Sequence, residues 1–250
     1  PLAIDKMLIV SVGGTKAGVI ALDPEQGNVR WKTEFYEASY SSPIAVNTPI
    51  GKRILIETRL STLLLNPGDG QVLGKIPFGS RGPTVNAATP IQISPNTYLL
   101  TANYGVGTVF LSITGNQLEP TFRSSTLLSS QYNTPIAIGS RVIGIDGRED
   151  VGVAALRAID TTTRSVVWER PGFGPSHLIA INREHALAVG LRGRLALLDG
   201  QADDYHELAA VDLPSGVYRA LPALGGRHLI VRRTLGPTNS ELLCVELPQP

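Results

Sequence analysis

Polar side chains that could hold a ligand stand next to short strands that open with Ser or Thr followed by Pro. Hydroxyls, amides and phenols that converge from several repeats can orient a polar ligand, sugar-like or peptide-like, without using charge. The same groups can instead cap strand ends and bind channel water, so both roles stay open. The candidates are Tyr40, Ser41, Asn86, Asn133 with Tyr132, and His177 with Ser176.

A charged pair forms a second candidate site. Asp146 and Arg148 lie in Ile-Asp-Gly-Arg, which predicts a turn between the second and third strands of the fourth repeat. Such a turn usually has structural meaning alone. Beside a channel mouth, however, the two side chains would supply an acid, a base or a clamp for a carboxylate. Arg81 and Arg192 are placed to contribute from neighbouring repeats.

Other patterns that support catalysis or metal binding are missing from the sequence. No two of the 4 histidines are spaced i, i+2 or i, i+4, which argues against a zinc site. Asp203-Asp204 lacks the alternating oxygens of a calcium loop, and no phosphate loop or nucleophile elbow is present. The single cysteine, Cys244, excludes an intramolecular disulfide, and we expect it to be a small buried hydrophobe. We therefore predict no catalytic residues and no metal.

The charge balance excludes two classes of partner. The chain has 22 basic and 21 acidic residues, for a net charge of +1. This balance gives no electrostatic footprint for nucleic acid or for an anionic membrane surface. The long uncharged stretch after Arg81 is interrupted by Pro, Asn and Gly, so no continuous apolar helix of about 20 residues fits and no transmembrane segment is predicted.

The elements that position these residues recur along the chain. Each repeat starts at a Ser/Thr-Pro strand or its variant and continues into a hydrophobic strand and a third strand that ends in a polar residue. The alternation has a period of two, which predicts strands throughout. The repeat length matches one four-stranded blade of a β-propeller. The sequence predicts a single all-β propeller domain of five complete blades and a partial sixth, at residues 1–42, 43–89, 90–134, 135–176, 177–221 and 222–250.

A tight turn after the third strand is the most regular part of the repeat. In Asp23-Pro-Glu-Gln-Gly27 the Asp side chain can bond N–H groups of its own turn, while the Gly can supply a positive φ. Eight positions after the polar residue, three of the five repeats have an aromatic residue, and the other two have Gly74 and Glu207. We interpret these aromatic residues as structural contacts that dock one blade onto the next: Trp31, Phe122 and Trp168.

These residues carry a resemblance to a known family. Val-Ile-Ala-Leu-Asp-Pro-Glu-Gln-Gly-Asn-Val-Arg-Trp31, together with Ser41-Ser-Pro-Ile-Ala-Val, resembles the pyrroloquinoline quinone-like propeller repeat. The match is closest to quinone-binding-like propellers of the bacterial envelope, which are related to the outer-membrane assembly lipoprotein. The resemblance implies an upstream signal peptide, a periplasmic or otherwise extracytoplasmic location, and missing N-terminal blades that would complete an eight-bladed ring.

Two functions follow from the resemblance. Quinone-dependent dehydrogenases with this repeat use a vicinal cysteine disulfide, a tryptophan floor, and Ca²⁺ held by Glu and Asn. One cysteine excludes the disulfide, and both tryptophans fall at blade-docking positions. We therefore favour a non-catalytic binding or scaffold propeller of the bacterial cell envelope that has no cofactor and engages a protein or glycan partner through its channel rim and loops. The alternative is a pyrroloquinoline quinone- and Ca-dependent alcohol or sugar dehydrogenase.

Overall fold

The computed structural model describes residues 1–82, 84 and 86–247. Over these residues the chain forms 23 strands. It divides into two compact units, Pro1–Pro135 and Ile136–Pro250, which are described separately. Nowhere in the described chain is there a helix that is long and apolar enough to span a membrane.

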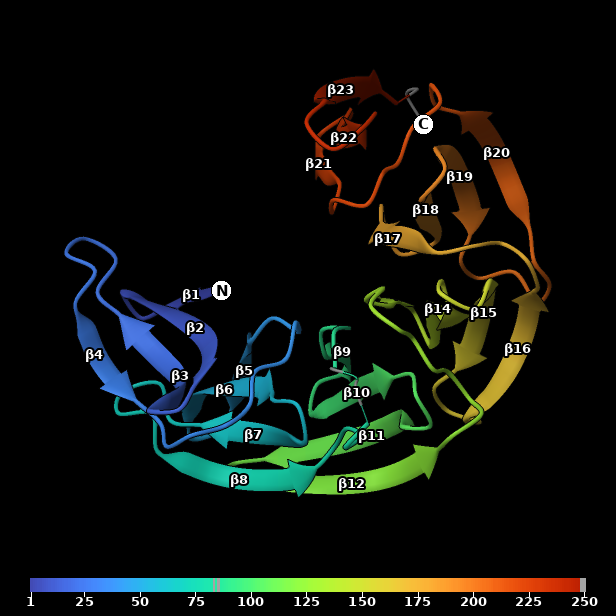
Figure 1. Cartoon of the computed structure of the whole chain (residues 1–250). Coiled ribbons are helices and arrows are strands. Elements are labelled where there is room, and N and C mark those ends of the chain that lie inside the picture. Colours follow the sequence, from blue (N-terminus) through green and yellow to red (C-terminus); the bar gives the residue numbers. More distant parts are fainter. Residues whose placement is uncertain (83, 85, 248–250) are drawn as a thin grey trace. The chain divides into compact units, whose positions relative to one another are not determined.

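The first unit contains three four-stranded sheets in which consecutive strands pair antiparallel (Figure 1). The first sheet contains β1 (Leu2–Ile4), β2 (Met7–Gly14), β3 (Ala17–Leu22) and β4 (Val29–Lys32). The second contains β5 (Ile44–Thr48), β6 (Gly51–Glu57), β7 (Ser61–Leu65) and β8 (Val72–Pro77). The third contains β9 (Ile91–Ser94), β10 (Thr97–Ala102), β11 (Gly107–Thr114) and β12 (Gln117–Ser124).

The second unit contains two four-stranded sheets and one three-stranded sheet with the same meander order. The fourth sheet contains β13 (Ile136–Ile138), β14 (Arg141–Arg148), β15 (Val153–Asp160) and β16 (Ser165–Arg170). The fifth contains β17 (Ser176–Ala180), β18 (His185–Gly190), β19 (Arg194–Asp199) and β20 (Glu207–Asp212). The three-stranded sheet contains β21 (Ala223–Gly225), β22 (His228–Thr234) and β23 (Ser240–Glu246). The predicted fold class, five complete blades and a partial sixth, is thus confirmed for the described residues.

Equivalent strands of neighbouring sheets lie next to each other within each unit. The first strands β1 and β5 are in contact, as are β13 and β17, and the fourth strands β8 and β12 run side by side (Figure 1). Apolar side chains fill the space between sheets. On β6, Ile54 and Ile56 join the cluster shared with the first sheet, whereas Leu55 joins the cluster shared with the third. The strand β6 is therefore buried on both faces, and each face belongs to a different hydrophobic cluster.

The turn between the third and fourth strands has the expected chemistry. Asp23 accepts hydrogen bonds from the backbone N–H groups of Glu25 (2.9 Å) and Gln26 (3.1 Å). Gly27 closes the turn at a φ of 73°, which a glycine adopts without steric cost. In the fourth sheet Arg164 occupies the corresponding position at a φ of 57°. The repeat thus keeps the turn geometry even where it has lost the glycine.

The predicted turn at Asp146 and Arg148 was wrong. Both residues lie in β14, and Arg148 pairs with Val153 of β15. The intervening Gly147 has a φ of 116°, and a Cβ there would lie 2.1 Å from the carbonyl oxygen of Val153. This glycine therefore permits a close approach of two paired strands, and the hairpin turns only after Arg148.

Cys244 is exposed, contrary to the expectation that it is buried. It lies in β23, the outer strand of the three-stranded sheet in the described chain. Leu243 and Val245 pack against the core of this part of the second unit. Because neighbouring side chains of a strand point to opposite faces, Cys244 lies on the uncovered face.

Candidate functional site

Most of the predicted rim residues are buried, and one is fully accessible. Ser41, Asn86, Asn133 and His177 are each less than 9% exposed, whereas Tyr40 is 81% exposed. Tyr40 and Asn86 lie together, because the Tyr40 N–H donates to the carbonyl oxygen of Asn86 at 2.9 Å. The Asn133 amide nitrogen is buried with no hydrogen-bond partner among the described residues. His177 lies in the second unit.

The Asn86 side chain is bonded to backbone. Its Nδ2 donates to the carbonyl oxygen of Thr58 at 2.9 Å and lies farther from those of Phe78 (3.3 Å) and Arg59 (3.4 Å). These carbonyls belong to the segments that follow β6 and β8. Asn86 therefore joins two loops of the second sheet to its own segment.

His177 is also engaged with backbone. Its Nε2 lies 2.9 Å from the carbonyl oxygen of Arg219, to which a protonated Nε2 donates. Burial lowers the pKa of His177, the hydrogen bond to Arg219 raises it, and the positive charge of Arg219 lowers it. The Arg219 guanidinium binds Glu149 in a fork, with N–O distances of 2.6 and 2.9 Å. The neutral imidazole of His177 thus helps to hold the backbone around Arg219 in place.

The charged candidates Asp146 and Arg148 each have an ionic partner nearby. A carboxylate oxygen of Asp146 lies 3.0 Å from Nη2 of Arg157, which also contacts Glu169 through Nε at 2.7 Å. The Nε of Arg148 donates to Asp150 at 3.0 Å. These groups form ion pairs along the sheet of β13 to β16.

Trp31 and Trp168, two of the three predicted docking aromatics, each reach the next sheet of their own unit. The Trp31 indole N–H donates to the carbonyl oxygen of Pro67 at 2.7 Å, and that of Trp168 donates to Ala202 at 3.1 Å. Phe122 packs edge-on against Phe110 of its own sheet, with 5.4 Å between ring centroids. Both indole nitrogens are therefore committed to contacts between sheets.

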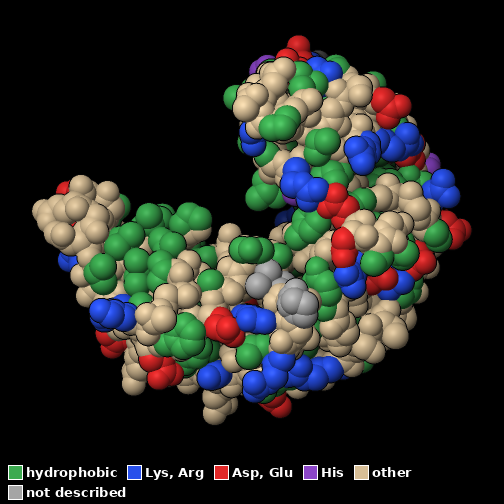
Figure 2. Space-filling model, viewed as in Figure 1, with side chains coloured by type: hydrophobic (Ala, Val, Ile, Leu, Met, Phe, Trp, Pro, Cys, Tyr) green, Lys and Arg blue, Asp and Glu red, His purple; other side chains and the backbone are tan. Residues whose placement is uncertain are grey.

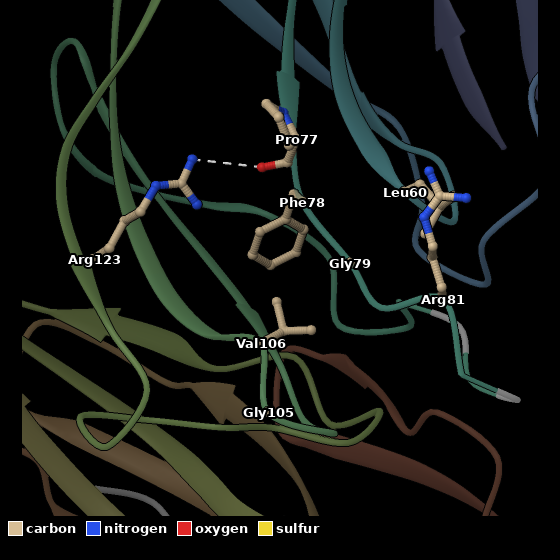
Figure 3. A pocket seen from close by; sticks show the side chains of 8 residues that line it. All are labelled: Leu60, Pro77, Phe78, Gly79, Arg81, Gly105, Val106 and Arg123. Atoms are coloured by element: carbon tan, nitrogen blue, oxygen red, sulfur yellow. Dashed lines mark hydrogen bonds between the residues drawn. The ribbon is translucent and has the colours of Figure 1, made fainter.

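A hollow in the first unit, here called the basic hollow, gathers two arginines over apolar side chains (Figure 3). Its volume is about 420 Å³. In Figure 3, Arg81 and Arg123 lie on opposite sides of Phe78, and Val106 faces the Phe78 ring. The complete lining is Leu60, Pro77, Phe78, Gly79, Arg81, Gly105, Val106 and Arg123.

A second hollow of about 470 Å³, here called the mixed hollow, shares Leu60 and Arg81 with the basic hollow. Its lining combines acidic, basic and aromatic side chains: Glu34, Phe35, Tyr36, Glu37, Thr58, Leu60, Ser61, Lys75 and Arg81. Figure 2 shows Lys and Arg side chains gathered over β8 and β12, the strands that carry Lys75 and Arg123. Basic side chains are thus concentrated on the surface of β8 and β12.

Local backbone geometry positions the basic hollow. The Phe78 N–H donates to the carbonyl oxygen of Leu60 at 3.1 Å, which joins the end of β8 to the loop after β6. Gly79 follows at a φ of 125°, and a Cβ there would lie 2.0 Å from the carbonyl oxygen of Arg59. Only glycine permits this close crossing of the two segments. Arg123 approaches from β12 and donates to Pro77 at 3.4 Å.

The residues present do not fit the quinone cofactor that the repeat suggests. The single cysteine cannot form a vicinal disulfide, and the indoles of Trp31 and Trp168 are buried in contacts between sheets. In the part of the chain that the structure describes, no three His, Cys, Asp or Glu side chains converge as a metal site would require. No chemical step is therefore assigned to this cofactor.

Comparison with known proteins supports the fold alone. No family model and no curated protein matches the sequence. Among solved structures, BamB from Moraxella catarrhalis is 16% identical with a TM-score of 0.51, and the match covers 91% of this chain and 79% of BamB. The Swd1 β-propeller domain of Myceliophteria thermophila is 13% identical with a TM-score of 0.61, over 98% of this chain and 84% of that domain.

A third similar structure is the dihydro-heme d1 dehydrogenase NirN in complex with DHE. It is 12% identical with a TM-score of 0.57, and the match covers 96% of this chain and 61% of NirN. At such identities the likenesses establish a β-propeller architecture, while function depends on the individual site.

Proposed function

We propose that this chain is a non-catalytic binding propeller that holds a protein partner at the basic hollow and the adjoining mixed hollow. The observation that carries the proposal is the basic hollow itself, where Arg81 and Arg123 flank the buried ring of Phe78 (Figure 3). Arginine and aromatic side chains are enriched at protein interfaces, where the guanidinium supplies directional hydrogen bonds. Propellers with many loops provide a rigid frame for such contacts.

A protein partner suits the hollow better than a glycan. Neutral sugars are held by many directed donors and acceptors, usually with an exposed aromatic face. The basic hollow offers two guanidinium groups and aliphatic contacts from Leu60 and Val106. The buried amide of Asn86 and the imidazole of His177, which were candidates for binding a polar sugar-like or peptide-like ligand, are bonded to backbone carbonyls. A peptide with apolar and charged side chains is therefore the better match.

The proposed setting is the bacterial cell envelope. It rests on the resemblance of the Val19 to Trp31 segment to envelope propellers, and the similarity of the fold to BamB is compatible with it. Kinship with the quinone-like repeat proteins is part of the same proposal. The dehydrogenase alternative lacks a supporting observation, because the cysteine and tryptophan residues do not provide its cofactor site.

Selection from a phage-displayed random peptide library tests the proposed function. The purified chain is the target, and the double variant Arg81→Gln/Arg123→Gln serves as the counter-target. We expect peptides that bind the wild-type chain and are depleted on the variant. A parallel titration with pyrroloquinoline quinone and Ca²⁺ tests the alternative. Stoichiometric quinone binding with dye-linked alcohol oxidation, or a selection without enrichment, would overturn the proposal.

A further inference from the structure

Resting on the proposed function, we propose that the basic hollow selects a peptide segment in which one hydrophobic side chain is flanked by carboxylates. The hydrophobic side chain contacts Phe78, Val106 and Leu60, and the carboxylates bind Arg81 and Arg123. The two arginines lie on opposite sides of Phe78, so one apolar group between two acidic groups matches their order (Figure 3).

Arg81 and Arg123 differ from Arg30 and Arg59 of the first unit in having no acidic partner among the described residues. They also differ from Arg53, whose guanidinium is bonded to the side chain of Asn116. Arg30 pairs with Asp23, and Arg59 pairs with Glu37 at 3.0 Å. Within the described chain, Arg81 and Arg123 form no ion pair, and Arg123 has only a long hydrogen bond to a backbone carbonyl. Arginine pairs well with carboxylates because its planar fork can donate two parallel hydrogen bonds. An external carboxylate is therefore the complementary group.

The basic hollow as a whole has the size of a side-chain pocket. A volume of about 420 Å³ lies within the range of small-ligand pockets, and it can take one large side chain with adjoining backbone. Phe78 is 3% exposed and is held by its own backbone bond to Leu60, so the floor is formed before a ligand arrives. A preformed floor avoids the free-energy cost of ordering it on binding.

The mixed hollow makes one end of the proposed site less favourable for acidic residues than the other end. Glu34 and Glu37 line it, and because Glu37 is paired with Arg59, Glu34 is the carboxylate that would repel an acidic segment. Of its two cations, Lys75 lies 4.9 Å above the centroid of the Tyr36 ring, and Arg81 is shared with the basic hollow. Carboxylates of the ligand are therefore favoured at the basic hollow and disfavoured beyond the shared residues Leu60 and Arg81. The ligand continues into the mixed hollow with neutral or basic residues.

Fluorescence anisotropy with three synthetic peptides tests the inference. The peptides are blocked at both ends and labelled with fluorescein: Gly-Asp-Phe-Asp-Gly, the amide control Gly-Asn-Phe-Asn-Gly, and the apolar control Gly-Asp-Ala-Asp-Gly. We expect the first to bind the full chain about tenfold more tightly than either control, because it gains two charge-assisted contacts and one buried ring. The preference for the acidic peptide over the amide control should weaken as salt is added, because salt screens the contacts between arginine and carboxylate.

Single-residue variants test whether Arg81 and Arg123 cause the preference for the acidic peptide. Arg81→Gln and Arg123→Gln should each reduce the preference for the acidic peptide, whereas Arg192→Gln, an exposed arginine of the second unit, should leave it unchanged. Equal affinity for the acidic and amide peptides would overturn the inference while leaving a protein partner possible. Absence of binding by all three would also overturn it, and the library selection then decides the proposed function separately. Binding that persists in both arginine variants would place the site elsewhere.

Discussion

The Trp31 indole nitrogen donates a 2.7 Å hydrogen bond to the carbonyl oxygen of Pro67, in the turn between β7 and β8 of the next sheet. The same turn brings Gly70 against the indole ring, where a Cβ would lie 2.3 Å from Cε3 of Trp31. One side chain thus joins two sheets through a polar contact and a close packing contact. The turn geometry that recurs along the chain thus also helps to hold these two sheets together.

Replacing Gly70 with Ala should destabilise the first unit more than the same change at Gly27. Both glycines have a φ of 73°, so alanine carries the same backbone penalty at each, about 1 kcal/mol. Only Gly70 contacts Trp31, whereas a Cβ at Gly27 meets no atom within 4 Å. We expect a further loss of about 1 to 3 kcal/mol for Gly70→Ala from overpacking, measured by urea denaturation. Equal losses would contradict the proposed joint.

Trp31→Phe should lower the free energy of unfolding by about 1 to 3 kcal/mol. The change removes the hydrogen bond to Pro67 and leaves a cavity beside Gly70. Phe35→Leu is the control, because this side chain is 51% exposed and its replacement should change stability by less than about 0.5 kcal/mol. Denaturation curves of the two variants provide the comparison. A Trp31 variant as stable as the control would show that the indole contact contributes little.

Asn86→Ala should reduce both stability and peptide binding. The side chain is 2% exposed and donates to Thr58, so its removal leaves a buried carbonyl oxygen without this donor. The expected loss is about 1 to 3 kcal/mol in the free energy of unfolding. Peptide affinity should also fall, because Asn86 holds the segment that contains Phe78.

The matched control for Asn86 is Tyr40→Ala. Tyr40 is 81% exposed, and its removal should change stability by less than about 0.5 kcal/mol. If Asn86 instead contacts a ligand without a structural role, its variant will unfold at the wild-type urea concentration while losing affinity. Chemical denaturation and anisotropy on the same samples separate the two roles.

The pH dependence of stability should reveal the buried carboxyl group of Glu57. Neither of its oxygens has a hydrogen-bond partner among the described residues. Burial raises the pKa of Glu57 well above its ordinary value of 4.5, and the Ser41 hydroxyl opposes this shift without completing a hydrogen bond. Between the unfolded and folded pKa values, the folded chain therefore holds the proton that the unfolded chain releases.

The free energy of unfolding should consequently fall as the pH rises above about 4.5, until the folded pKa is passed. Glu57→Gln removes this ionisation and should flatten the profile, so the variant gains stability relative to wild type as the pH increases. Urea denaturation at a series of pH values measures the slope. A constant difference between the two proteins across the series would mean that Glu57 ionises normally in the folded chain.

The fold could be predicted from the sequence because its determinants are local and repeated. The continuous apolar run Ile54, Leu55 and Ile56 is typical of a strand buried on both faces, and the Asp-Pro turn fixes where the next strand begins. A local pattern of the same kind, Asp146-Gly147, led to the wrong prediction of a turn. There, a glycine required by the pairing of β14 with β15 reads in the sequence as a turn.

The basic hollow could not be predicted in the same way. It brings Arg123 next to Phe78 and Arg81, which lie in one segment distant from Arg123 in the sequence, through the adjacency of β8 and β12. The sequence indicates Arg81 only as a possible contributor to the charged site at Asp146 and Arg148, and nothing in the spacing indicates that Arg123 lies near it. The polar residues before the Ser/Thr-Pro strands gave a stronger pattern, and two of them, Asn86 and His177, bond to backbone carbonyls.

Amide hydrogen–deuterium exchange of the full chain, with and without the peptide Gly-Asp-Phe-Asp-Gly, tests the central claim most directly. Bound peptide should slow exchange in residues 78–82, 105–107 and 123–124, which surround the basic hollow. Exchange near His177 in the second unit should not change. Protection around His177 or Asn133 without protection at Phe78 and Arg123 would contradict the account.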